Sequence, residues 1–249
     1  MGVDAETSKA QLRVRIRSER EARSAALTES SPAETESSVA GAAWQLVEGL
    51  WPELDLTDRS MLAYAALAGE PDLDPVIDQF LAHGGTVYLP VVTTVGHALM
   101  FGAVTESMST LEPRGQWGIR EPSPSLTASD LLSAEVAPDL VFVPALGFGP
   151  GGARLGNGGG FYDRTFGPQG EAPLPANEQV GPAADACHTV GAPHHGVCGD
   201  SAFRDSAHGE VVVCGVCFAT EIELAGLTVE PWDLQIPRAV TNHGVHTFG

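Results

Sequence analysis

Residues 139–166 read Asp139-Leu-Val-Phe-Val-Pro-Ala-Leu-Gly-Phe-Gly-Pro-Gly-Gly-Ala-Arg-Leu-Gly-Asn-Gly-Gly-Gly-Phe-Tyr-Asp-Arg-Thr-Phe166. The stretch opens with an unbroken apolar run, Leu140 to Val143, before a proline. Such a run is typical of a strand that is buried on both faces of a parallel sheet. The sequence therefore predicts a central strand here, followed at its carboxyl end by a glycine-rich loop.

The glycine-rich loop has the composition of an anion-binding site. Glycine has no Cβ, so its backbone can take positive φ and neighbouring N–H groups can converge on one anion. The glycines concerned are Gly156, Gly158, Gly159 and Gly160. Arg154 adds a forked positive charge just before them. We predict a phosphate cradle. The alternative is a loop that only turns the chain, although a turn needs one or two glycines.

Two common nucleotide motifs fit this chain poorly. Gly147 to Gly152 matches G-x-G-x-x-G, but Pro150 and the following glycines delay the helix that should hold a pyrophosphate. The only lysine is Lys9, far from any glycine cluster, and this excludes a Walker loop.

Length and composition set the class of protein. The 249 residues could form one α/β domain or two small ones. The 32 acidic and 13 basic residues give a formal charge of −19, which disfavours nucleic acid as a partner. No apolar run approaches the ~18 residues of a membrane span, and the first residues lack the apolar core of a secretion signal. We therefore expect a cytoplasmic protein that binds no membrane. Four cysteines do not suggest a disulfide scaffold.

The chain before the glycine-rich loop predicts alternating helices and strands. Helices are expected at 8–27, 39–50 and 73–83, and strands at 62–68 and 86–92. Strand, helix and strand form a βαβ unit, whose ligand face lies at the carboxyl ends of the strands. Glu70 stands at such an end, where it could equally complement a helix dipole. Lys9 and Arg13 lie one turn apart on one helix face, which is often merely a solvated basic face.

Residues 154–164 resemble the signature R-L-G-x-G-x-G-[FY]-Y-D-R of the 5-formyltetrahydrofolate cyclo-ligases. The length and the aromatic-Tyr-Asp ending make this pattern far more specific than a lone glycine motif. The K-x-x-x-R of Lys9 and Arg13, Leu89 to Val92 with Met100-Phe101, and the G-I-x-E-P segment at residues 118–122 resemble further parts of the family pattern. The resemblance covers most of the chain outside residues 1–7 and 167–209.

The resemblance implies a fold and an activity. It implies an α/β, three-layer Rossmann-like fold with a mainly parallel central sheet flanked by helices, in a single domain over residues 1–249. The implied reaction is the ATP-dependent closure of 5-formyltetrahydrofolate to 5,10-methenyltetrahydrofolate, with Mg²⁺ as a further cofactor. The substrate could carry a polyglutamate tail. We expect a monomer.

The resemblance also implies roles for individual residues. Catalytic roles fall on Lys9, Arg13 and Arg154. The expected nucleotide site adds Gly156, Asn157, Gly158, Gly159, Gly160, Phe161 and Tyr162. The expected folate site contains Arg13, Glu70, Met100, Trp117, Asn157, Gly158, Gly159, Gly160 and Phe161. Asp163 and Asp233 are the expected Mg²⁺ ligands, because Mg²⁺ is a hard ion that needs oxygen ligands. Phe161 and Tyr162 could instead anchor the loop to the core, and a structural role for Glu121 is as plausible as a catalytic one.

Some features depart from the family pattern. Trp232 replaces the usual His or Asn, Gly149 stands in place of an Asp, and a Gly-, Pro- and His-rich insert is expected at about 167–209. Cys187, His188, His194, His195 and Cys198 of the insert are ligand types for zinc, although uncoordinated surface histidines explain them as well. Cys214 and Cys217 lie three apart on a predicted strand, so they should point to opposite faces. An alternative function is an inactive nucleotide- or folate-binding protein whose insert binds a metal or a partner.

Overall fold

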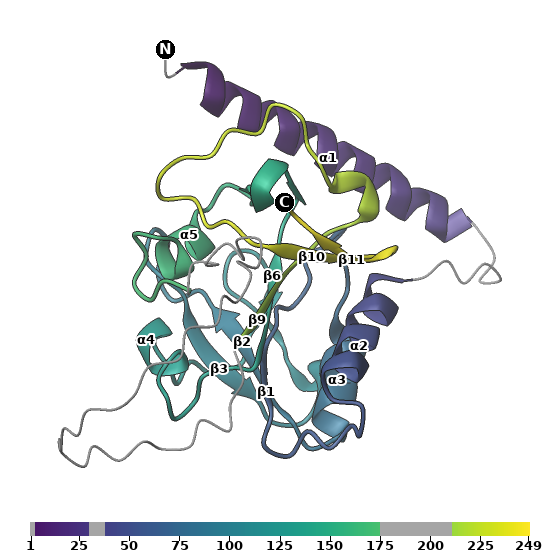
Figure 1. The fold of residues 1–249 in the computed structure, drawn as a ribbon, viewed down its shortest axis with the longest axis vertical. Coiled ribbons are helices and arrows are strands. Elements are labelled where there is room, and N and C mark those ends of the chain that lie inside the picture. The colour runs from purple at the N-terminus through teal and green to yellow at the C-terminus, as the bar shows by residue number, and fades with distance from the viewer. Residues whose placement is uncertain (1–2, 30–37, 175–210) are drawn as a thin grey trace, which may run out of the picture.

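The computed structural model describes residues 3–29, 38–174 and 211–249. Within them, seven strands form one sheet in the order β11-β10-β9-β6-β1-β2-β3 (Figure 1). These strands are β1 (Ser60–Leu62), β2 (Thr86–Val91), β3 (Met100–Val104), β6 (Leu140–Pro144), β9 (Val212–Val216), β10 (Arg238–Thr241) and β11 (Gly244–Thr247). From β10 to β2 the neighbours are parallel, whereas β3 and β11 pair antiparallel at the two edges.

Helices cover both faces of the sheet. Helices α2 (Val39–Leu50) and α3 (Asp74–Ala82) pack on one face, where Val47, Ile77 and Phe80 join a core with Phe142 of β6. Helices α4 (Ala128–Leu131) and α5 (Phe161–Phe166) pack on the other, around Val141 of the same strand. Because β6 is fully buried on both faces, its unbroken apolar sequence is explained. The predicted three-layer α/β fold is confirmed.

Helix α1 (Val3–Glu29) belongs to neither layer but crosses one end of the molecule (Figure 1). Its apolar residues Leu12 and Ile16 pack against Leu146, Leu155, Leu224 and Leu227. Arg20 is buried and donates to both carboxylate oxygens of Glu221 at 2.8 Å and to the carbonyl of Ala145 at 2.8 Å. Ala145 follows β6 and Glu221 follows β9, so these contacts hold α1 over the carboxyl ends of the parallel strands.

Short elements complete the described chain. They are β4 (Pro113–Arg114) paired with β5 (Ile119–Arg120), β7 (Gly147–Phe148) paired with β8 (Arg154–Leu155), and the 3₁₀ turns η1 (Met108–Thr110), η2 (Pro150–Gly152) and η3 (Ala219–Glu221). None of the described helices is long and apolar enough to span a membrane.

The expected strand at 62–68 is wrong over most of its length. Strand β1 ends at Leu62, and the chain then leaves the sheet and turns at Gly69, where φ is +81°. The Glu70 N–H closes this turn on the Leu67 carbonyl at 2.9 Å. The apolar residues after Leu62 are there because they border a buried region, and burial alone does not distinguish a strand from an irregular segment.

The first part of the predicted insert lies at the surface but is held there by backbone hydrogen bonds to α5. Residues 167–174 fold back on α5, with the N–H groups of Glu171, Ala172 and Leu174 donating to carbonyls at residues 164–166. Leu174 is buried in the core on that face. The rest of the predicted insert, including Cys187, His188, His194, His195 and Cys198, lies outside the described residues.

Candidate active site

A cavity of about 1120 Å³ lies between α1 and the carboxyl ends of the parallel strands. Its walls come from α1, the turn after β1, the glycine-rich loop after β8 and the segment around Asp233. Ligands of open α/β sheets bind at this edge, beyond the carboxyl ends of the strands. The predicted residues that line the cavity are Lys9, Arg13, Glu70, Trp117, Arg154, Gly156, Asn157, Gly158, Gly159, Gly160, Phe161, Tyr162, Asp163 and Asp233.

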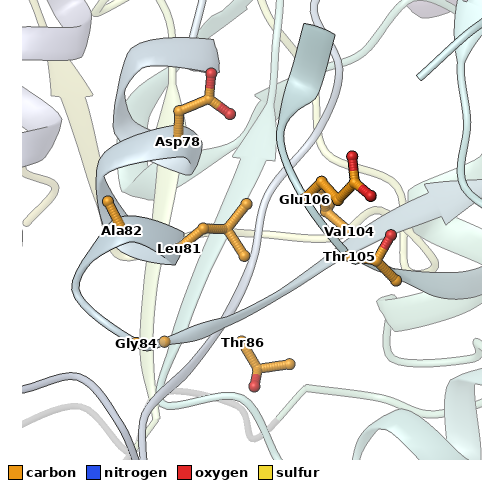
Figure 2. A pocket seen from close by; sticks show the side chains of 9 residues that line it. Asp78, Leu81, Ala82, Gly84, Thr86, Val104, Thr105 and Glu106 are labelled. Atoms are coloured by element: carbon orange, nitrogen blue, oxygen red, sulfur yellow. The ribbon is translucent and has the colours of Figure 1, made fainter. Parts of the chain in front are cut away.

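A second hollow, of about 340 Å³, lies at the opposite edge of the sheet, by the start of β2 and the end of the antiparallel β3. Figure 2 shows its side chains, among them the carboxylates of Asp78 and Glu106. Its lining residues are Asp78, Leu81, Ala82, Gly84, Gly85, Thr86, Val104, Thr105 and Glu106. Both charged residues in this lining are acidic, so the hollow offers no cation to a phosphate.

Helix α1 supplies a row of cations to the larger cavity. Lys9, Arg13 and Arg17 recur every four residues and therefore share one helix face. Lys9 Nζ lies 2.7 Å from Asp233 Oδ2, and Arg13 Nε donates to the Gly156 carbonyl at 3.0 Å. The structure thus brings both predicted cations of the N-terminal helix to the glycine-rich loop. Leu12 and Ile16 of α1 pack into the core, and this packing turns the face with the cations toward the loop.

The glycine-rich loop leaves its backbone N–H groups unused. Gly158 and Gly160 have φ values of +98° and +63°, which glycine adopts without strain. None of the N–H groups from Gly156 to Gly160 donates to an acceptor in the part of the chain that the structure describes. Gly156 and Gly160 are half-buried, whereas Asn157, Gly158 and Gly159 are exposed, and all five residues line the cavity. The loop therefore offers several donors to a bound anion.

Arg154 is held rigidly beside this loop. Its guanidinium is almost fully buried and donates from Nη2 to Asp163 Oδ1 at 2.7 Å and from Nη1 to the Pro144 carbonyl at 3.3 Å. Burial alone would raise the pKa of the Asp163 carboxyl, but the charge and hydrogen bond of Arg154 outweigh burial and hold this pKa below its usual value. The Asp163 carboxyl is therefore ionised at neutral pH.

Two buried polar atoms next to the cavity lack partners among the described residues. They are Arg154 Nε and the hydroxyl of Tyr162, whose ring lies 5.5 Å from the Arg154 guanidinium. Burial raises the pKa of the Tyr162 phenol, which keeps the hydroxyl protonated and able to donate. Unpartnered buried donors are costly to the fold.

Next to the glycine-rich loop, the cavity wall carries Glu70 and aromatic side chains. Glu70 Oε2 accepts from the Leu67 N–H at 3.0 Å, so the carboxylate is fixed by its own turn. Trp117 and Phe161 meet edge to face with ring centroids 5.6 Å apart, and Trp117 is 42% exposed. Buried Glu121 also lines the cavity and accepts from the Val92 N–H at 3.0 Å, which gives it a structural role. This part of the wall suits a flat polar ring system.

Met100 is not brought to the cavity. Its neighbour Leu99 lines the cavity, and Phe101 packs into the core beneath it. Side chains alternate across a strand, so Met100 points away from the face that Leu99 and Phe101 share. Met100 is therefore the one expected folate-site residue that does not line this cavity, and Leu99 lies on the wall.

Comparison with known proteins decides the family. A sequence model of the 5-formyltetrahydrofolate cyclo-ligase family matches residues 5–182, which is most of the chain. The chain belongs to the 5-formyltetrahydrofolate cyclo-ligase family. The 5-formyltetrahydrofolate cyclo-ligase of Mycolicibacterium smegmatis is 32% identical over 124 residues, covering 49% of this chain and 62% of the relative. That of Escherichia coli K12 is 32% identical over 110 residues, covering 43% and 57%. The matched region thus spans less than two thirds of these cyclo-ligases.

Solved structures agree on the fold of the family. The NMR structure of Aquifex aeolicus 5,10-methenyltetrahydrofolate synthetase has a TM-score of 0.56 and 19% identity, covering 96% of this chain and 92% of that one. A 5,10-methenyltetrahydrofolate synthetase from Mycoplasma pneumoniae has a TM-score of 0.50 and 16% identity, covering 94% and 98%. At such identities the likeness concerns the α/β fold alone.

The carboxylates of Asp163 and Asp233, which are expected to bind Mg²⁺, suit an ion that takes only a few of its ligands from the protein. Asp163 uses Oδ1 for Arg154 and the Leu234 N–H, and Asp233 uses Oδ2 for Lys9 and the Glu230 N–H. The remaining oxygen of each carboxylate has no partner among the described residues. No group of three or more metal-ligand side chains occurs in the described parts of the chain. Two carboxylates suffice for Mg²⁺ when phosphate and water complete its shell.

The cysteines of β9 do not form a metal site. Cys214 lies in the core on one face of the sheet and Cys217 in the core on the other. Their predicted divergence is confirmed. Burial raises the pKa of the Cys214 thiol to about 12, as expected for an inert core cysteine.

Sequence reasoning missed several residues of the site. Arg17, Arg20, Tyr64 and Trp232 all line the cavity, and Trp232 is 51% exposed there. The i+4 spacing from Arg13 could have revealed Arg17. The others depend on how the end of the chain packs against α1, which no local pattern encodes.

Proposed function

We propose that this protein catalyses the ATP-dependent cyclisation of 5-formyltetrahydrofolate to 5,10-methenyltetrahydrofolate, with release of ADP and phosphate. The observation that supports this most is the convergence of Lys9, Arg13 and Arg154 with the unused amides of the glycine-rich loop on one wall of a cavity. Glu70 and the pair Trp117 and Phe161 line the same cavity beside the glycine-rich loop. A cavity wall that combines cations and loop amides with a carboxylate and aromatic rings suits the two substrates of this reaction.

The chemistry explains why this reaction needs ATP. Ring closure requires the formyl oxygen to leave, and oxide is a very poor leaving group. Transfer of the γ-phosphoryl group to that oxygen forms a P–O bond and releases ADP. N10 then attacks the formyl carbon, the carbon–oxygen bond breaks, and phosphate leaves with the oxygen while N10 gives up its proton. No protein nucleophile is needed.

The residues around the phosphates would act by positioning and charge. Lys9 and Arg13 approach from α1 and Arg154 from β8, so a triphosphate between them would meet cations from two sides. Fixed donors stabilise the charge that moves during phosphoryl transfer without having to reorganise. Asp163 and Asp233 would hold Mg²⁺, which neutralises phosphate charge when bound.

The carboxylate and the aromatic residues beside the loop would orient the folate. The Glu70 carboxylate can accept two N–H groups from the guanidine-like edge of a pterin. Trp117 and Phe161 offer aromatic surface to its ring. Such orientation brings the formyl oxygen and the γ-phosphate together, which can supply much of the rate enhancement.

The experiment is direct. Purified protein is mixed with 5-formyltetrahydrofolate, Mg²⁺ and ATP, and the absorbance of the methenyl product is followed. ATP-dependent product formation supports the proposal. Binding of both ligands without product would contradict it and favour an inactive binding protein. Sedimentation of the same sample tests the expected monomer, and cell fractionation tests the expected cytoplasmic location.

A further inference from the structure

A chain of hydrogen bonds joins three segments that are distant in sequence. Arg17 Nη2 on α1 donates to the backbone carbonyl of Asn157 at 2.9 Å and to its Oδ1 at 3.3 Å. Asn157 Nδ2 in turn donates to Glu70 Oε1 at 2.8 Å. The chain therefore runs from a cation on the helix, through the glycine-rich loop, to the carboxylate of Glu70.

Asn157 orients Glu70 Oε1, which is the carboxylate oxygen that the turn of Glu70 does not hold. Glu70 Oε2 is already held by the Leu67 N–H within its own turn. The remaining oxygen, Oε1, has Asn157 as its partner. The side-chain amide of Asn157 is in turn oriented by Arg17, because only its Oδ1 can accept from a guanidinium. Loss of Arg17 would thus loosen Asn157 first and Glu70 second.

Arg17, like Arg13, donates to a loop carbonyl and in this differs from three other cations of the cavity wall. Lys9 is paired with Asp233, Arg20 with Glu221 and Arg154 with Asp163. The hydrogen bonds of Arg17 go instead to uncharged oxygens of the loop. Arg17 therefore holds the loop through hydrogen bonds and does not act as the partner of an ion pair.

The loop that Arg17 holds is rich in glycine, so ordering it has a large entropic cost. Glycine loses more conformational freedom on ordering than any other residue, so a segment with four glycines is costly to fix on binding. The carbonyls of Gly156 and Asn157 are held by Arg13 and Arg17, which lie one helical turn apart. Holding Asn157 before the ligand arrives keeps its side chain in place to hydrogen-bond Glu70, which removes part of that entropic cost from binding at Glu70.

We infer that Arg17 is a positioning residue for the pterin end of the substrate, acting through Asn157 on Glu70. The inference rests on the proposed function, since the ligand of Glu70 is taken to be the folate. Arg17 does not need to touch either substrate. Its removal should weaken folate binding, while Lys9, Arg13 and Arg154 continue to hold the phosphates.

The test compares Arg17→Ala and Arg17→Lys with Arg15→Ala as the matched control. Arg15 is an exposed neighbour on α1 that pairs with Glu19 at 3.7 Å and is not among the residues that line the cavity. The dissociation constant of 5-formyltetrahydrofolate is measured by calorimetry. The inhibition constant of inorganic tripolyphosphate, which lacks a base and a pterin, reports on the phosphate site.

The expected result is selective. Arg17→Ala raises the dissociation constant and the KM for the folate about tenfold, the loss expected of one hydrogen bond to a charged group, and changes the tripolyphosphate constant less than twofold. Arg17→Lys, which can still donate to the Asn157 carbonyl, restores folate binding to within about threefold of the unmodified protein. Asn157→Ala shows the same selective loss, and adding Arg17→Ala to it has less effect than in the unmodified protein.

Two results would overturn the inference. One is a tenfold weaker tripolyphosphate inhibition with unchanged folate binding, because Arg17 would then contact phosphate directly. The other is equal behaviour of Arg17→Ala and Arg15→Ala. Failure of the unmodified protein to form methenyl product contradicts the proposed function instead, and it is separable because folate binding is measured without turnover.

Discussion

Lys9 Nζ and Asp233 Oδ2 lie 2.7 Å apart, although the two residues are separated by 224 positions in the sequence. The pair joins two parts of the chain across the cavity. The N-terminal helix lies on one side, and the segment before β10 lies on the other. Asp233 also accepts from the Glu230 N–H at 2.8 Å, so its carboxylate is fixed before it meets the lysine. Lys9 is 7% exposed and therefore serves both the site and the packing of α1.

Replacing Lys9 should reduce both activity and stability. Lys9→Ala removes a cation from the phosphate site, and we expect kcat/KM for methenyl formation to fall about 100-fold or more. It also leaves Asp233 without its cation in a mostly buried place, which should lower the free energy of unfolding by about 1–3 kcal/mol. Turnover assays and urea unfolding of the same sample separate the two effects. Activity within fivefold of the unmodified protein would exclude Lys9 from the chemistry.

The ion pair between Arg20 and Glu221 should hold α1 in place. Both side chains are buried, and without Arg20 the Glu221 carboxylate keeps only the longer contact with Arg23, whose Nη1 lies 3.8 Å from Glu221 Oε1. We expect Arg20→Met alone to destabilise the protein by about 3–5 kcal/mol, and Arg20→Met combined with Glu221→Leu to cost much less. Urea unfolding of the two variants checks this. If the double variant were less stable than the single one, the ion pair would contribute more to the free energy of unfolding than the mutual neutralisation of its two charges.

The glycines of the β7–β8 connection offer a matched test of backbone approach. A Cβ on Gly152 would lie 1.9 Å from the Ile236 carbonyl oxygen, whereas a Cβ on Gly151 would meet nothing within 4 Å. Both residues have positive φ, +74° and +63° respectively. Gly151→Ala should therefore cost only the conformational strain of about 1–2 kcal/mol. Gly152→Ala should cost clearly more, because β10 follows Ile236 and would be displaced. Equal thermal stability of the two variants would contradict this.

Acid should weaken the structure partly through Asp163. Its pKa lies below that of the unfolded chain, which is about 3.9, so the ionised carboxylate stabilises the fold. This contribution is fully present above about pH 4 to 5 and is lost as the pH falls through the folded-state pKa. Unfolding midpoints at pH 7 and pH 3 should therefore differ more in the unmodified protein than in Asp163→Asn. An equal pH dependence in both would mean that other groups account for the acid sensitivity.

Local patterns were enough to predict the central strand and the loop. An unbroken apolar run can be satisfied only by burial on both faces, and β6 is buried in that way. The glycines after it and the i+4 pair of Lys9 and Arg13 also have local meaning, and the structure brings them to one cavity. These features needed no knowledge of the rest of the chain.

Other parts of the site depend on contacts that no local pattern contains. Arg20 is an ordinary helix residue until α1 docks against Glu221. Apolar residues after Leu62 suggested a longer strand, because burial at the cavity wall and burial in a sheet produce the same composition. The position of the Met100 side chain was not predicted for a related reason. The face of the sheet on which it lies depends on the strand register, and a register shift of one residue moves it to the other face.

The central claim is that ATP phosphorylates the formyl oxygen within this cavity, and an isotope measurement tests it most directly. The protein is given 5-formyltetrahydrofolate carrying oxygen-18 in the formyl group, together with unlabelled ATP and Mg²⁺, and the released phosphate is examined by mass spectrometry. The account predicts one oxygen-18 atom in each phosphate formed with the methenyl product. Unlabelled phosphate, or product formed without ATP, would contradict it.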